Sequence, residues 1–231
     1  MVDDVRRIPE FLHLTPAEGG WRVVIVDGAE DMNRNGANAL LKVLEEPPPR
    51  AVLLLVCSAA GRLLPTIRSR CRRLRLPALT DATMSALLAR YLPDTAETER
   101  ERLAVLGEGS IGRALLLAGG GVAMADMVGQ VLDALPDLGA ARAHEVADAL
   151  GRDEDAFTTF MDLLRAAVAA AVRGVASGRA DLDQTRLVGA RPLDAWVDVW
   201  HGLTRLQSET EGLHLDKRQA LLAGFALLAG R

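Results

Sequence analysis

The chain contains few aromatic residues. They make up 3% of its 231 residues, although hydrophobic residues as a whole make up 49%. A hydrophobic core must therefore be built from leucine, alanine and valine, a composition that favours helices at most positions. A chain of this length suits two or three small domains.

Metal-ligating residues are also scarce. Cys57 and Cys71 are the only cysteines, and the four histidines are scattered without the spacing of metal ligands. Two cysteines cannot complete a zinc site by themselves. We therefore expect small thiols in a reducing compartment and no metal site.

Long apolar runs are missing as well. No run reaches the roughly 18 residues that a membrane span requires. The net charge of −4 does not steer the molecule as a whole towards DNA or anionic lipid. We expect a soluble, cytoplasmic protein that does not bind membranes.

Lysine is rarer still, and its two positions exclude one kind of nucleotide site. A P-loop has the pattern GxxxxGK(S/T), in which a glycine-rich turn cradles phosphates and the lysine reaches them. Lys42 follows Leu41 and Lys217 follows Asp216. This sequence therefore contains no P-loop.

Residues 1–78 alternate strand and helix signals. Short apolar runs at 21–26 and 51–57 suit buried parallel strands, and "RRLRL" predicts a third strand at 72–76. Between the first two runs, "NGANALLKVLEEPPP" has one apolar helical face and ends in three prolines, which stop the helix. Strands separated by helices predict an α/β domain with a parallel sheet.

The strand signals end at Leu79. Residues 79–121 contain three short helices punctuated by glycines, which suit a small satellite domain. From 122 to 231 only longer amphipathic helices are predicted. We place these helices near 123–134, 139–150, 153–177, 192–210 and 216–229. The predicted fold class is thus a partial α/β sheet followed by two all-α domains.

A cluster of six arginines lies between Arg62 and Arg75 with no acid among them, around "PTIRSRCRRLRL". The alternation at its end puts Arg73 and Arg75 on one side of the predicted third strand, opposite two leucines. We interpret them as the solvated side of an edge strand, where charge deters edge pairing. A DNA-binding patch is disfavoured, because the chain is acidic and no aromatic residue lies among these arginines for base stacking.

The first apolar strand ends on an acid, in "VVIVDGAEDM". Asp27 would lie at the carboxyl edge of a parallel sheet, where open α/β sheets bind ligands. In P-loop NTPases such an aspartate helps to hold magnesium, but the next residue here is Gly28, which can neither hold the metal nor orient water. Two interpretations remain open: a degenerate metal-binding position, or a residue that caps the following turn.

Three stretches of the sequence, at Asn38–Pro48, Ala51–Ser58 and Thr66–Cys71, together resemble the clamp-loader branch of the AAA+ ATPases. Within that branch, "FLHLTPAEGGWRVVIVD" and "RLLPTIRSRCRRLRL" are most similar to the delta-prime family of bacterial DNA polymerase III subunits. The resemblance is dense over residues 3–77, is visible again at "GEGSIGRAL", and fades beyond about residue 125.

The resemblance implies a role for the Ser-Arg-Cys motif, which falls on Ser69, Arg70 and Cys71. In clamp loaders the arginine of this motif reaches the γ-phosphate of ATP in a neighbouring subunit. A guanidinium suits that task because it presents a rigid, permanently charged fork. Arg70 is thus expected to be an arginine finger that acts in trans.

The family's own nucleotide site is degraded in this sequence. The resemblance makes Asp27 a Walker B position and Ser58 a sensor 1 position, but neither has a P-loop beside it. The sensor 2 arginine position holds Gly112, and Arg113 is displaced by one residue, about 100° around a helix. We expect no ATP hydrolysis by this chain itself, and ATP with Mg²⁺ only in the neighbouring subunit.

The resemblance therefore predicts a non-catalytic clamp-loader subunit. Its expected partners are other clamp-loader subunits of the gamma/tau and delta types and, through the complex, the sliding clamp and primer–template DNA. Residues 122–231 would form the helical collar that assembles the ring. The alternative is an ATP-hydrolysing subunit whose P-loop lies in sequence upstream of this chain.

The family's sheet has five parallel strands in the order 5-1-4-3-2. The three predicted strands would be strands 3, 4 and 5, and nothing in the sequence supplies strand 1 between 5 and 4. A missing central strand leaves backbone groups unpaired. We therefore expect the chain to be amino-terminally truncated.

Overall fold

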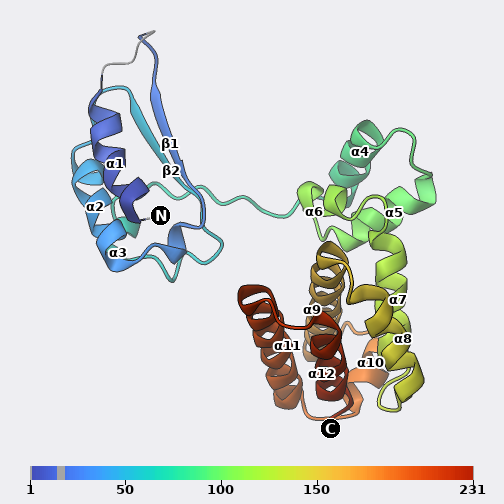
Figure 1. Ribbon diagram of the computed structural model, residues 1–231. Helices are drawn as coiled ribbons and strands as arrows, with labels where there is room; N and C mark the ends of the chain where they lie inside the picture. The colour runs from blue at the N-terminus through green and yellow to red at the C-terminus, as the bar shows by residue number, and fades with distance from the viewer. Residues whose placement is uncertain (1, 15–18, 231) are drawn as a thin grey trace. The chain divides into compact units, whose positions relative to one another are not determined.

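The computed structural model describes residues 2–14 and 19–230, and it separates into two compact units, Met1–Pro77 and Ala78–Arg231 (Figure 1). Met1, Arg231 and residues 15–18, which belong to the stretches and domains discussed above, lie outside the described residues. The two units are described separately below.

The first unit contains a two-stranded parallel sheet. Strand β1, Arg22–Val26, pairs with β2, Ala51–Leu55, with Val24 opposite Leu53. The pairing continues past the strand ends through the hydrogen bond from Val56 N to Val26 O, 2.9 Å. The expected parallel pairing is confirmed, but the expected burial of both strands is wrong: Val23 is 48% exposed, Ile25 65% and Leu54 47%. Each strand has the β-branched and leucine side chains that strands favour.

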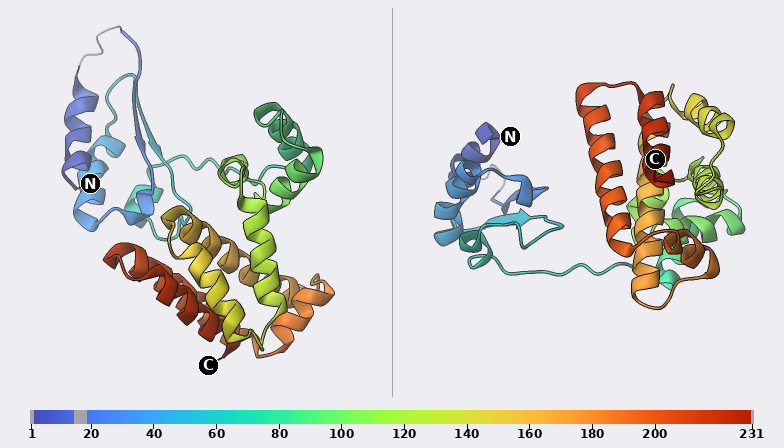
Figure 2. Two further views of the ribbon diagram at one scale, coloured as in Figure 1. Left: turned by 45° about the vertical axis from the view of Figure 1, so that its right-hand side comes forward. Right: turned by 90° about the horizontal axis from the view of Figure 1, so that it is seen from below.

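Helices cover one side of this sheet (Figures 1 and 2). They are α1, Val2–His13, and α2, Arg34–Glu45, followed after β2 by the short α3, Pro65–Arg68. The side chain of Asn33 caps α2 by accepting from Gly36 N at 2.9 Å, which satisfies a free amide of the first turn. The largest fully buried side chains among the described residues of this unit are Leu12, Leu40 and Ile67.

The third predicted strand does not form. Residues 72–76 have no regular secondary structure, and Leu74 and Leu76 are each 82% exposed. A strand needs a neighbour for its amides and carbonyls, and no segment of the described residues pairs with 72–76. Arginine and leucine alternate in this segment, but both kinds of side chain are exposed to solvent.

The second unit is entirely helical in its described part. Buried side chains from α4 to α12 form one continuous core, which includes Leu88, Phe157, Leu164 and Trp196. The helices are α4 Asp81–Tyr91, α5 Glu97–Leu106, α6 Ile111–Leu116, α7 Gly121–Asp133, α8 Ala140–Leu150, α9 Glu154–Ala176, α10 Leu182–Gly189, α11 Leu193–Leu213 and α12 Lys217–Ala229.

The predicted fold class is confirmed: a partial α/β sheet precedes an all-α region. Two short α-helices of the described residues were missed, the four-residue α3 and the eight-residue α10. The start of α10 carries a readable signal, since Asp181 and Gln184 form a capping box. The division of the helices at about residue 121 stays a prediction. In the described part of the chain, no helix is both long enough and apolar enough to cross a membrane.

Candidate functional site

Arg70 follows the short helix α3 and is held by it. Pro65 occupies the first turn of α3, where a missing amide costs nothing, and Ser69 N donates to Pro65 O at 3.0 Å to end the helix. The Nη1 atom of Arg70 donates to Thr66 O at 2.9 Å and to Ser69 Oγ at 3.4 Å. The turn thus fixes one end of the guanidinium, while 34% of the Arg70 side chain stays exposed.

A carboxylate from a different element pairs with the same guanidinium. The Nη2 atom of Arg70 lies 2.5 Å from Oε1 of Glu45. Glu45 is the last residue of α2, where the helix dipole is negative and a carboxylate is unfavourable unless a cation neutralises it. The ion pair therefore links the end of α2 to the turn that carries Arg70.

The rest of the Ser-Arg-Cys motif has structural contacts. Ser69 Oγ donates to Thr66 O at 3.1 Å. Cys71 is a half-buried free thiol, and its partial burial raises its pKa, so the thiol stays protonated at neutral pH. Neither arrangement identifies a nucleophile, and Arg70 is the member of the motif whose charge reaches the surface.

The neighbouring arginines of the cluster make other contacts than Arg70 does. Arg62 pairs with Asp31 at 3.3 Å, and Arg68 donates to Ala60 O at 3.5 Å. The remaining arginines of the cluster lie in the irregular segment and are exposed; they are Arg72, Arg73 and Arg75.

The second candidate group lies at the carboxyl ends of β1 and β2. Asp27 follows β1, and its Oδ1 accepts from Gly28 N at 3.0 Å. Gly28 has a positive φ of 62°, a conformation that glycine adopts without strain. The carboxylate of Asp27 thus accepts a hydrogen bond from the residue that begins the following turn.

Ser58 is joined to a residue that the sequence did not single out. Its hydroxyl donates to Oε1 of Glu30 at 2.5 Å, and its amide donates to the same oxygen at 2.9 Å. The hydroxyl of Ser58 first, and then the backbone amides of Glu30, Ser58 and Ala59, lower the pKa of Glu30 from 4.5 to about 2. The segments that follow β1 and β2 are therefore joined through Glu30 and Ser58.

The polar side chains near this edge of the sheet have partners within the chain. The hydroxyl of Ser58 donates to Glu30, and one carboxylate oxygen of Asp27 accepts from Gly28 N. Among residues 2–14 and 19–230, no cluster of three histidine, cysteine or carboxylate side chains could hold a metal ion. No hydrogen bond or ion pair in this part of the chain joins Asp27 or Ser58 to Arg70.

The displaced arginine of the second unit has a local partner. Arg113, in α6, pairs with Glu108 at 2.8 Å. Gly112, at the sensor 2 position, has open space around its α-carbon. Arg113 is thus held by an ion pair within its own helical unit.

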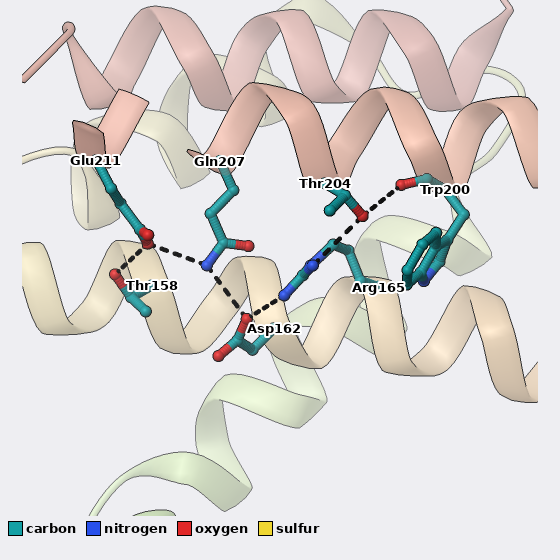
Figure 3. Close-up of polar contacts among 7 residues, drawn as sticks. All are labelled: Thr158, Asp162, Arg165, Trp200, Thr204, Gln207 and Glu211. Atoms are coloured by element: carbon teal, nitrogen blue, oxygen red, sulfur yellow. Dashed lines mark hydrogen bonds and ion pairs between the residues drawn. The ribbon is translucent and has the colours of Figure 1, made fainter. Parts of the chain in front are cut away.

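A polar seam runs between α9 and α11 in the second unit (Figure 3). Gln207, which is 6% exposed, donates through Nε2 to Asp162 at 3.2 Å and to Glu211 at 3.0 Å. Asp162 also accepts from Arg165 at 2.5 Å. The buried Oε1 of Gln207 and Nε of Arg165 have no hydrogen-bond partner in the described part of the chain. The seam aligns two long helices and contains no group of side chains arranged for catalysis.

Sequence reasoning found Arg70, Asp27 and Ser58 but missed two glutamates: Glu45, which pairs with Arg70, and Glu30, which bonds to Ser58. Glu45 lies within the quoted "KVLEEPP", where its position at the helix end was a usable signal. Glu30 lies three residues after Asp27, but its bond to Ser58 depends on the parallel pairing of β1 and β2.

Comparison with known proteins gives relatives of one kind. A family model described as DNA polymerase III, delta subunit, matches residues 1–80. The DNA polymerase III subunit delta-prime of Pseudomonas aeruginosa is 46% identical over 121 residues, which are 52% of this chain and 37% of that protein. The gamma/tau subunit of Mycobacterium bovis is 30% identical over 208 residues, 90% of this chain and 32% of that protein.

Among solved structures, a gamma-subunit-related protein from Thermotoga maritima aligns with 100% of this chain and 79% of its own. The TM-score is 0.46 at 22% identity, which is too weak a likeness to support an argument. The chain spans about a third of the length of the two curated relatives. The resemblance to the delta-prime and gamma/tau subunits of bacterial DNA polymerase III, which the sequence indicated, is confirmed.

Proposed function

Because this chain is related to the delta-prime and gamma/tau subunits of bacterial DNA polymerase III, we propose that it is a non-catalytic clamp-loader subunit. In this proposal it donates Arg70 to the ATP site of a neighbouring subunit and helps to assemble the cytoplasmic ring that loads the sliding clamp onto primed DNA.

The observation that carries the proposal is the setting of Arg70. Its guanidinium is anchored at Nη1 by Thr66 and Ser69, yet a third of the side chain is exposed. An anchored cation at a surface loses little further freedom when it meets a phosphate, and its planar donors match phosphate oxygens. Such a group is suited to stabilising the charge that develops when phosphate is transferred in a neighbouring site.

The strand ends support the non-catalytic part of the proposal. A subunit that hydrolyses ATP directs acidic and polar side chains from these strand ends at Mg²⁺ and the γ-phosphate. Here Ser58 is bonded to Glu30, and Gly28 replaces the acid that would orient water. ATP and Mg²⁺ are accordingly assigned to the neighbouring subunit, and none to this chain.

The helical unit supports a role in assembly. Its long helices, α9 and α11, are aligned by a polar seam and share one core with α12. Helices of this length offer extended surfaces for packing against other subunits. We assign gamma/tau-type and delta-type subunits as direct partners, and the clamp and primer–template DNA as partners of the complex.

The test uses the full-length protein reconstituted with its partner subunits. Arg70→Ala is compared with Arg72→Ala, which removes the same charge from an exposed position two residues away. We expect both variants to enter the complex and only Arg70→Ala to lose ATP-driven loading of a labelled clamp onto primed DNA. Loss of assembly with Arg70→Ala would show a structural arginine. Mg²⁺-dependent ATP hydrolysis by the isolated full-length subunit would favour the ATPase alternative.

A further inference from the structure

Glu45 contributes the only ion pair that Arg70 makes among the described residues, at 2.5 Å between Oε1 and Nη2. The other two anchors of Arg70, Thr66 O and Ser69 Oγ, come from the same short turn as Arg70 itself. These two contacts hold the guanidinium against α3 alone, which is fixed to the unit by the buried side chain of Ile67. Glu45 links the guanidinium to a second element, because it ends the twelve-residue helix α2.

We propose that Glu45 is a positioning residue for Arg70: it holds the guanidinium in the orientation in which it meets a phosphate of the neighbouring subunit. This inference rests on the proposed function of Arg70 as a trans-acting finger. Glu45 itself touches no substrate in this account, and it acts only through Arg70.

The arrangement of donors leaves room for a phosphate. The hydrogen bonds to Thr66 and Ser69 both use Nη1, and Glu45 lies against Nη2. Among the described residues, Nε of Arg70 forms no hydrogen bond, so its N–H remains available to donate to a phosphate oxygen. A guanidinium has five N–H donors and can hold a carboxylate with one part while it presents another to an anion.

Two features argue that the contact is more than an incidental surface pair. The carboxylate lies at the negative end of a helix dipole, so it is better retained there with a cation beside it. Glu46 comes next in the chain and is followed by three prolines at 47–49, which restrict the backbone after the helix. Glu45 is therefore a carboxylate at a stiff position, which is what positioning a flexible arginine requires.

The neighbouring glutamate supplies a matched control. Glu46 is exposed, carries the same charge, and forms no ion pair among the described residues. Glu45→Gln and Glu46→Gln therefore make the same change in net charge at adjacent positions. Glu45→Asp keeps the charge but shortens the side chain by one methylene.

The experiment measures steady-state ATP hydrolysis by the reconstituted complex, with thermal melting and complex assembly as folding checks. We expect Glu45→Gln to lower kcat about threefold to tenfold, since small displacements of a catalytic group cost rate rather than substrate binding. KM and assembly should not change. Glu46→Gln should behave like the wild type, and Glu45→Asp should recover part of the loss.

The decisive comparison is the double variant. In an Arg70→Ala background, Glu45→Gln should have no further effect, because a residue that acts only through Arg70 has nothing left to position. An equal loss in both backgrounds, unchanged hydrolysis, or faster hydrolysis in Glu45→Gln alone would each overturn the positioning role. If Arg70→Ala itself leaves hydrolysis unchanged, the proposed function fails instead, and the inference fails with it.

Discussion

The hydroxyl of Ser58 donates a 2.5 Å hydrogen bond to Oε1 of Glu30, and this bond ties together the carboxyl ends of β1 and β2. In an open parallel sheet those ends form the edge at which ligands bind. A side chain that could contact a phosphate is thus already paired within the chain. At this edge of the described sheet, the hydroxyl of Ser58 therefore serves the structure of the unit.

The first prediction concerns the ionisation of Glu30. Its pKa is lowered to about 2, chiefly by the Ser58 hydroxyl. Ser58→Ala should raise this pKa towards 4.5, as followed by NMR titration of the carboxyl carbon. Because the folded-state pKa is lowered, the stabilisation is complete above about pH 4.5 and is lost as the pH falls towards 2.

Ser69→Ala is the control for this titration, because it removes a hydroxyl of the same unit that bonds to Thr66 O instead. It should leave the pKa of Glu30 unchanged. A wild-type pKa near 4.5 would mean that the bond between Ser58 and Glu30 does not form in solution.

The second prediction concerns residues 72–76. Their amides lie outside the sheet, so they should exchange with deuterium at rates close to those of an unfolded chain. The paired amides of β1 and β2 should be protected. Leu74→Ser should change the free energy of unfolding by less than about 0.5 kcal/mol, because the side chain is already exposed. Protection of 72–76 equal to that of β2 would show that the third strand forms after all.

The third prediction contrasts two glycines of the helical unit. Gly109 has a φ of +78°, and a β-carbon there would lie 2.7 Å from Ala78 Cβ. Gly109→Ala should therefore lower the free energy of unfolding by about 1–3 kcal/mol, measured by denaturant titration. Gly112→Ala, in α6 with open space around it, should be neutral or stabilise the unit by up to about 1 kcal/mol. Equal effects at the two positions would contradict the backbone geometry described here.

The fourth prediction concerns the polar seam. Gln207 is buried and donates to Asp162 and Glu211, so Gln207→Ala removes two hydrogen bonds and opens a space between α9 and α11. It should cost about 1–3 kcal/mol of unfolding free energy. Glu209→Ala, on the exposed side of the same helix, should stay within about 0.5 kcal/mol of the wild type. A Gln207→Ala variant as stable as Glu209→Ala would show that the seam does not align the helices.

Much of the fold was predictable because the apolar spacing is strong. The helix α2 and the parallel strands β1 and β2 follow from patterns within each segment. The third strand did not, because the alternation at 72–76 describes a strand only if a partner pairs with it. Pairing depends on distant residues, which a local pattern does not contain.

The candidate site was predictable in part. Arg70 stands out because the Ser-Arg-Cys motif resembles that of a known family, and its anchors are local in the sequence. Its ion pair with Glu45 spans two helices, and the bond between Ser58 and Glu30 spans two strands. Contacts of this kind arise from packing, so only the folded structure reveals that Glu45 and Glu30 belong to the site.

The central claim is that Arg70 serves a phosphate in another subunit, and its most direct test is ATP hydrolysis at the neighbouring site of the reconstituted complex. Arg70→Ala should slow hydrolysis there by a factor on the order of 10³, the usual contribution of an arginine finger, without loss of assembly. Arg70→Lys should restore little, because an ammonium lacks the planar fork. Hydrolysis at the wild-type rate in an assembled Arg70→Ala complex would contradict the claim.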